Sequence, residues 1–166
     1  GDIFWITPAD FKTTDKFVSC GKRNLSQAGY NSCGTTLVPA NSVVFSKRAP
    51  VGTVAVTTGE LCTNQGCLSC VPEKTTNSLF YYYAMSVFTE QFELVSTGTT
   101  FKEISGTAIK NVPVLIPDDK SLSSFQSFCN PVFTEQEKLE AEKNKKRDIK
   151  ISTFLIIYNY DFTRIF

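Results

Sequence analysis

The sequence contains no histidine, and this absence removes several classes of enzyme. A Ser-His-Asp triad, a histidine-ligated zinc site and an imidazole general base all require that side chain. Neither of the glycine-rich phosphate-binding patterns, GxGxxG and GxxxxGK(S/T), occurs in the chain. No apolar run reaches the roughly 18 residues that a transmembrane helix needs. Most common enzyme classes are therefore excluded before any motif is considered.

The composition is that of an ordinary globular domain. The chain has 166 residues, of which 42% are hydrophobic and 20% are charged. This is enough apolar material for a core, and a domain of this size buries roughly two thirds of its unfolded surface. The sequence predicts one globular domain of the α+β class with an appendage.

The net charge of +1 conceals a basic segment early in the chain. Residues 11–50 hold six cations and one acid, Asp15, so the segment carries +5. Such an excess suits a surface for a polyanion, because each Lys or Arg placed on a phosphate releases a counterion. The alternative is a solvated face with an accidental bias, and a pI near 7.7 lies below the value of about 9 typical of nucleic-acid domains. The charge leaves both interpretations open.

Six cysteines allow either free thiols or a metal cluster. Cys62, Cys67 and Cys70 form a C-x4-C-x2-C pattern, which is one ligand short of a zinc or iron–sulfur site. On an extended strand, positions 67 and 70 point to opposite faces. We therefore expect no metal and free thiols, as in a reducing cytoplasm.

Local signals divide the first 117 residues into strands and helices. Turn residues and β-branched runs predict strands at 42–46, within 51–57 and at 67–71. Ser78 is a candidate cap for an apolar helix at 79–94, and a short helix is expected at 105–109. Residues 98–100 (GTT) read as a flexible polar loop, and residues 111–116 as a strand that ends at Pro117.

After Pro117, the spacing predicts a helix over residues 118–150. Two aspartates favour its N-terminus through the macrodipole, and Pro131 is expected to kink or break it. Alternating steps of three and four residues indicate a coiled-coil seam that needs a partner helix. The alternative is a long helix folded back onto its own domain. The predicted helix-pairing residues are Leu122, Phe125, Cys129, Val132, Gln136 and Leu139.

The tail at 151–166 does not continue this pattern. Ten of its sixteen residues are apolar or aromatic, with β propensity and no seam. We expect it to pack on the protein or on another copy, since an exposed segment of this kind would aggregate.

Five local strings, in their order and spacing, carry a resemblance to a known family. They are 5–11 (WITPADF), 45–52 (FSKRAPVG), 63–66 (TNQG), 98–105 (GTTFKEIS) and 111–117 (NVPVLIP). Over residues 3–146 the chain resembles one half of a type I restriction–modification specificity subunit.

The resemblance implies a role in DNA recognition. Such subunits carry two target recognition domains, each followed by a long helix, and the two helices pair as an antiparallel spacer. Each domain reads one half of a bipartite double-stranded DNA site. The subunit itself has neither catalytic activity nor a cofactor. It positions methyltransferase subunits, which bind S-adenosylmethionine, and restriction subunits, which consume ATP.

Applied to this chain, the resemblance implies three parts. They are an N-terminally truncated target recognition domain at 1–117, a spacer helix at 118–150 and an apolar tail of uncertain packing at 151–166. The chain would be a half-subunit or fragment, and a homodimer through the helix would supply the other half. The change of character after about Lys146 suggests a reading frame disrupted by frameshift or recombination. A cytoplasmic location and no membrane contact are expected.

Candidate DNA-binding residues are those that can hold phosphates or read base edges. Lys and Arg bind phosphates, while Arg, Asn and Gln can also pair with guanine or adenine. The candidates are Lys12, Lys16, Lys22, Arg23, Lys47, Arg48, Asn64, Gln65 and Lys102.

Each candidate also has a structural alternative. The KRAPVG motif can simply shape a strand crossing, the TNQG turn can satisfy its own backbone, and Lys102 can pair with a nearby acid. A protein-interaction or oligomerisation domain that never meets DNA is the competing function.

Overall fold

The computed structural model describes residues 1–48, 50–74, 78–98 and 102–162, with side chains up to residue 147. Its strands are β1 (Ile3–Ile6), β2 (Phe17–Val18), β3 (Arg23–Leu25), β4 (Leu37–Val38), β5 (Val43–Ser46), β6 (Val54–Thr57), β7 (Leu61–Thr63) and β8 (Cys67–Cys70). Its helices are the 3-10 helix η1 (Pro8–Asp10), α1 (Gln27–Ser32), α2 (Ser78–Val87), α3 (Thr89–Leu94), α4 (Gly106–Lys110) and α5 (Asp119–Phe162). Ala49, most of the 98–100 loop, Phe101 and residues 163–166 of the tail lie outside the described ranges.

The strands form two four-stranded mixed sheets. The first sheet has the order β3-β1-β7-β4 and the second has the order β2-β6-β5-β8. β1 pairs with β7 in parallel, with Trp5 opposite Cys62, and β2 pairs with β6 in parallel, with Phe17 opposite Val56. All other named pairs are antiparallel.

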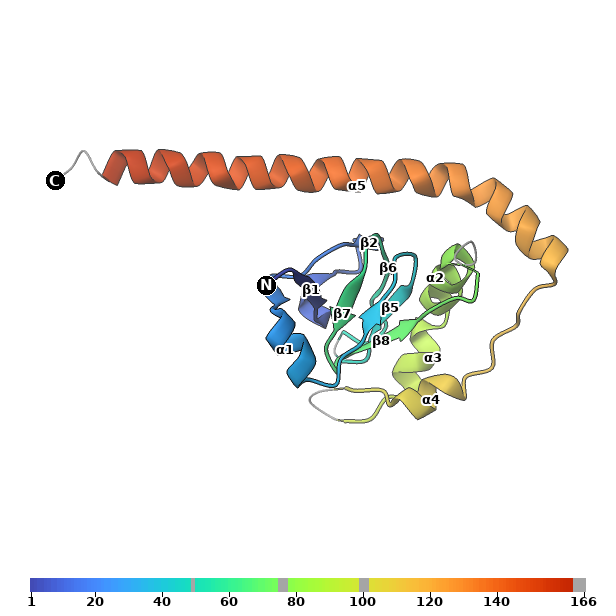
Figure 1. The fold of residues 1–166 in the computed structure, drawn as a ribbon. Coiled ribbons are helices and arrows are strands. Elements are labelled where there is room, and N and C mark those ends of the chain that lie inside the picture. Colours follow the sequence, from blue (N-terminus) through green and yellow to red (C-terminus); the bar gives the residue numbers. More distant parts are fainter. Residues whose placement is uncertain (49, 75–77, 99–101, 163–166) are drawn as a thin grey trace. The chain divides into compact units, whose positions relative to one another are not determined.

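The core lies where β-branched and aromatic residues meet. Every residue of β5 and β6 is buried, so both faces of these central strands are covered. α2 packs on β5 and β6, as Figure 1 shows. The ring of Phe92, in α3, lies edge-on to the ring of Phe45, with the two ring centres 4.9 Å apart. The structure confirms the strand predicted at 42–46, which is β5, and its complete burial fits its run of apolar residues.

The predicted helix at 79–94 is two helices, so that prediction was wrong in its continuity. The chain leaves helical geometry at Phe88, with ψ near 4°, before α3 begins. The hydroxyl of Thr89 donates to the carbonyls of Met85 and Gly52. Gly52 has φ +94°, and a Cβ there would lie 2.3 Å from a Thr89 methyl, so this close approach requires glycine.

Two further predictions near these elements had different outcomes. The short helix expected at 105–109 is present as α4, and Ser105 caps it by accepting from the amide of Ala108 at 3.0 Å. The strand expected at 111–116 is absent from the described residues. Pro113 and Pro117 have no backbone N–H to donate to a neighbouring strand. Leu115 is 87% exposed, so strand pairing here would gain little from apolar burial. The sequence did not predict α1, a helix of only six residues.

α5 begins as expected and ends later than expected. Asp118 accepts from the amide of Ser121 at 2.7 Å, and these hydrogen bonds lower the pKa of its carboxyl. The helix passes through Pro131 and continues to Phe162, so the predicted end at 150 was wrong. No Gly or Pro occurs between 151 and 162 to stop the hydrogen-bond ladder.

The contacts of the chain define two compact units. These units are Gly1–Asn130 and Pro131–Phe166, so the first turns of α5 belong to the first unit. Among the described residues, no helix combines the length and apolar character needed to cross a membrane.

Replacing Phe45 with Ala tests the core. Phe45 is fully buried, so removing its ring should lower the free energy of unfolding by about 3–5 kcal/mol. Urea denaturation followed by circular dichroism measures this change. The matched control is Leu115→Ala at an exposed site, which should change stability by less than about 0.5 kcal/mol. Equal effects of the two substitutions would contradict the assigned core.

Candidate nucleic-acid interface

One end of the two sheets collects most of the predicted DNA-binding residues. β1 and β7 end there and β3 begins there, because Trp5 lies opposite both Arg23 and Cys62. β5 ends and β8 begins at the same place, because Ser46 lies opposite Cys67. The turn from β7 to β8 joins the two sheets, and the amide of Lys47 donates to the carbonyl of Gly66 at 2.8 Å. We call this region the loop end.

At the loop end, Asp10 links two parts of the chain. One carboxylate oxygen accepts from the amide and the hydroxyl of Thr7, both at 2.8 Å. The other oxygen accepts from the backbone amide of Lys22 at 3.0 Å. The chain before β2 is therefore tied to the chain before β3.

Two basic residues of the early segment lie against aromatic rings. The guanidinium of Arg23 lies 5.5 Å from the centre of the Trp5 ring, its neighbour on β1. The ammonium of Lys16 lies 5.8 Å from the ring centre of Tyr83 in α2, and the Lys16 carbonyl accepts from the amide of Val56. Lys16 is thus engaged beside β6 and α2, whereas Arg23 stays at the loop end and is exposed.

The second basic group follows β5. Arg48 pairs with Glu103 at 3.3 Å, with about half of each side chain exposed, so the pair contributes little to stability. The amide of Ile104 donates to the carbonyl of Lys47, which brings Lys102 and Glu103 beside this group. Lys102 is exposed and Lys47 is half-buried. The structural alternative for Lys102 was an ion pair; the ion pair that the structure shows here belongs to Arg48 instead.

The TNQG turn satisfies its own backbone, as the structural alternative predicted. The side-chain oxygen of Asn64 accepts from the amide of Gly66 at 3.0 Å. The backbone amide of Asn64 donates to the carbonyl of Ile6, which fixes the turn to β1. Gln65 is exposed at the tip of this turn. The side-chain oxygen of Asn64 is therefore used within the turn, whereas that of Gln65 accepts no hydrogen bond from the turn.

The cysteines are free thiols in the structure. Burial raises the pKa of the Cys67 thiol to about 12, the nearby Asp10 carboxylate adds to the rise and Lys47 opposes it. Burial also raises the pKa of Cys62 and of Cys70. In the described part of the chain, no three His, Cys, Asp or Glu residues are grouped as metal ligands.

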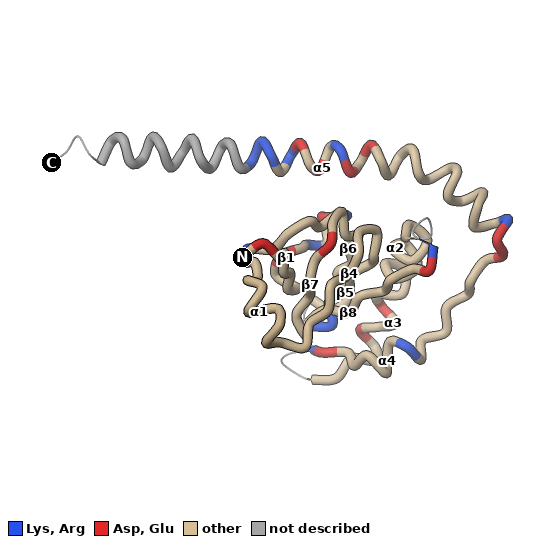
Figure 2. The backbone as a smooth tube through the Cα atoms, in the orientation of Figure 1, with Lys and Arg blue, Asp and Glu red and all other residues tan. Residues whose placement is uncertain are grey.

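The structure therefore brings together eight of the nine predicted DNA-binding residues, with Lys16 set apart by its contact with Tyr83. Lys12 lies two residues after the end of η1 and is exposed. The charges around the loop end are mixed, since Asp10, Asp15 and Glu103 accompany the cations, and Figure 2 shows acidic and basic segments interspersed over the domain.

Sequence reasoning missed Asp10 and Trp5. The signal for Asp10 was present, because Thr7-Pro8-Ala9-Asp10 has the spacing of a capping box, and the structure forms that box around η1.

The predicted helix-pairing residues divide along α5. Leu122 is buried with 8% exposed, and the Phe125 ring meets Tyr83 edge-on at 6.1 Å, so these two positions are covered where a partner helix was expected. Cys129 and Gln136 are half-buried. Val132 and Leu139 are 55% and 56% exposed.

The family described as the type I restriction modification DNA specificity domain matches residues 1–127. The chain belongs to this family. Two curated specificity subunits are similar to it. The chain is 28% identical to that of the type I restriction enzyme MjaIX of Methanocaldococcus jannaschii, over 83% of this chain and 33% of the relative. It is 24% identical to that of the HindI enzyme of Haemophilus influenzae, over 81% of this chain and 30% of the relative.

Two solved structures share the fold. The HsdS subunit of Thermoanaerobacter tengcongensis superposes with a TM-score of 0.53 at 17% identity, over 83% of this chain and 31% of that one. A chain solved in work on complex assembly and conformational transition of the type I R-M system gives a TM-score of 0.57 at 17% identity, over 87% of this chain and 34% of that one. These comparisons confirm the predicted α+β fold with its long helix. The chain spans about a third of the length of these specificity subunits.

The raised thiol pKa values predict that stability falls at high pH. An unfolded thiol loses its proton near pH 8.5, whereas folded Cys67 keeps it to about pH 12. The unfolded state therefore binds fewer protons in that window, and the Cys67 thiol lowers the free energy of unfolding by up to about 1.4 kcal/mol per pH unit there. Urea titrations at pH 8 and pH 10 measure the loss.

The control for this prediction is a pair of cysteine variants. Cys67→Ala should reduce the difference between the two pH values, and Cys20→Ala, at an exposed site, should leave it unchanged. An identical pH dependence in all three proteins would show that Cys67 is not protected in the fold.

Proposed function

We propose that this chain is a non-catalytic DNA-recognition component of a type I restriction–modification complex and reads one half of a bipartite site. The observation that carries the proposal is the loop end, where basic residues from three separate segments and an exposed glutamine lie at one end of the two sheets. Membership of the specificity family supports it. So does the lack of histidine and of grouped metal ligands in the described residues.

The loop end offers two kinds of contact to a duplex. Lys12, Lys22 and Lys102 are exposed and suit phosphates, which set position without reading sequence. Arg23, held over Trp5, and Gln65, at its turn, carry the donors and acceptors that select guanine and adenine edges. Arg48 would exchange Glu103 for a phosphate at little cost, because the pair is half exposed.

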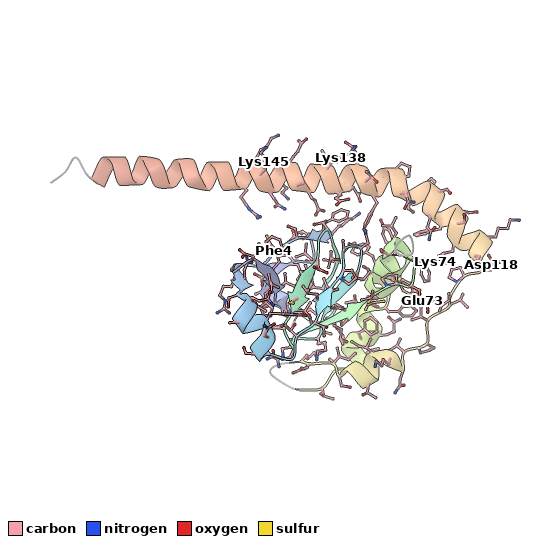
Figure 3. The ribbon with its side chains drawn as sticks, in the orientation of Figure 1. Phe4, Glu73, Lys74, Asp118, Lys138 and Lys145 are labelled. Atoms are coloured by element: carbon pink, nitrogen blue, oxygen red, sulfur yellow. The ribbon has the colours of Figure 1, made fainter. Side chains whose placement is uncertain are left out.

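α5 fits the role of a spacer helix. Its charged stretch alternates in sign, as Figure 2 shows, and includes the pair between Lys138 and Glu135 at 3.7 Å. Lys138 and Lys145 extend from this stretch in Figure 3. Val132 and Leu139 are seven residues apart and so lie on one face, exposed. That face would pair with the helix of a second specificity half, either another chain or a second copy, and the pair would carry methyltransferase and restriction subunits.

The salt dependence of duplex binding tests DNA recognition. A duplex is selected from a randomised pool with the full chain and its methyltransferase subunit, and affinity for the chain is then measured against salt concentration. Each phosphate contact contributes about −0.9 to the log–log slope. Lys22→Gln should make the slope shallower by about 1, since it removes one contact. Glu60→Gln, an exposed change between β6 and β7, is the control and should leave the slope unchanged.

Two outcomes would contradict the proposal. Failure of the pool to yield any bound duplex, or an affinity that does not change with salt, would favour the competing function of a protein-interaction or oligomerisation domain. One observation supports the protein-interaction function: several apolar residues of α5 are exposed.

The pairing role of α5 has its own test. Replacing both Val132 and Leu139 with Lys should abolish self-association or pairing with a second half, because the charges cannot be buried in a helix seam. Light scattering after size exclusion measures the mass. Glu137→Lys combined with Lys138→Glu, at exposed positions, is the control that should leave the mass unchanged. A double lysine variant that still pairs would place the seam elsewhere.

A further inference from the structure

The strongest unexplained feature of the loop end is the carboxylate of Asp10. It accepts three hydrogen bonds, from the amide and hydroxyl of Thr7 and from the amide of Lys22, twelve residues away. Charge-assisted bonds to a carboxylate are among the stronger hydrogen bonds in proteins. An acid placed beneath a surface for DNA is unfavourable for phosphate binding, so its position calls for a reason other than charge.

The chain comes unusually close to β1 where Asp10 holds it. A Cβ on Gly21 would lie 2.2 Å from the carbonyl oxygen of Trp5 and 3.0 Å from a carboxylate oxygen of Asp10. Gly21 therefore lets the backbone cross here, and Asp10 fixes the next residue, Lys22. Arg23 then pairs with Trp5 across the strands and lies over its ring at 5.5 Å.

We propose that Asp10 is a positioning residue that fixes the Lys22–Arg23 step for contact with DNA. This rests on the proposed function and deepens it by naming what holds the two exposed cations. Lysine and arginine lose considerable side-chain entropy when they bind DNA. A backbone that is already fixed lowers the total entropy cost of binding, because only the side chains then have to be ordered. The hydrogen bond of Asp10 to the Lys22 amide supplies that fixed backbone at the entry to β3.

The proposal and simple electrostatics predict opposite results for Asp10→Asn. Removing a negative charge near cations should tighten phosphate binding if Asp10 acts only through its charge. If Asp10 positions Lys22 and Arg23, the amide loses acceptor capacity, the step loosens and binding weakens. The sign of the change therefore separates the two explanations.

The experiment compares wild type, Asp10→Asn and Asp2→Asn on the duplex selected by the wild-type full chain. Asp2 is exposed beside the N-terminus, so its substitution removes the same charge without touching this network. We expect Asp10→Asn to bind about tenfold more weakly, the loss of about one charged contact, with a shallower salt slope. Amide hydrogen exchange should show faster exchange at Lys22 in that variant. Asp2→Asn should equal wild type or bind slightly tighter.

The outcomes separate this inference from the proposed function. A wild type that binds no duplex overturns the proposed function and this inference with it. A wild type that binds, with Asp10→Asn of equal or higher affinity, overturns the positioning role alone. Thr7→Val keeps the carboxylate and removes one of its donors, so it decides the matter if Asp10→Asn does not fold. That variant should bind with intermediate affinity, and wild-type affinity with unchanged exchange at Lys22 would also overturn the positioning role.

Discussion

The rest of the domain depends on how the backbone passes between two sheets at one end. There η1 follows β1, the TNQG turn connects β7 to β8, and the chain enters β3. Each passage ends a strand ladder and leaves amides that need partners. The Lys47 amide finds the Gly66 carbonyl, the Gly66 amide finds the Asn64 side chain and the Lys22 amide finds Asp10. Polar side chains are thus concentrated at this end because the topology requires them there.

Much of the local structure could be predicted from sequence, because its causes are local. The β-branched run at 43–46, the serine cap before α4 and the aspartate before α5 each act within a few residues. The resemblance of five strings then gave the family. The basic character of the first third was also visible, but its gathering at one end was not. That gathering results from parallel pairing of β1 with β7, whose partners are more than fifty residues apart in the sequence.

The errors came from contacts that composition does not encode. The break at Phe88 depends on Thr89 meeting Gly52, 37 residues away. The segment 111–116 has the β-branched residues of a strand but no neighbouring strand to pair with in the described structure. The tail at 151–162 has β propensity, yet it extends an existing helix, and continuing a helix is easier than starting a new element. In each case tertiary or nucleation effects outweighed intrinsic propensity.

The side chains of the loop end fall into two groups, those that hydrogen-bond backbone amides and those that are exposed to solvent. The side-chain oxygens of Asp10 and Asn64 accept hydrogen bonds from backbone amides, so substitutions there disturb the backbone of the loop end. Lys12, Lys22 and Gln65 are exposed, and substitutions at such positions usually alter stability by less than about 0.5 kcal/mol. In the proposed DNA-recognition role, the exposed side chains could therefore change while the hydrogen-bonded backbone that presents them stays the same. This division between the two groups follows from the hydrogen bonds, because only the first group holds backbone amides in place.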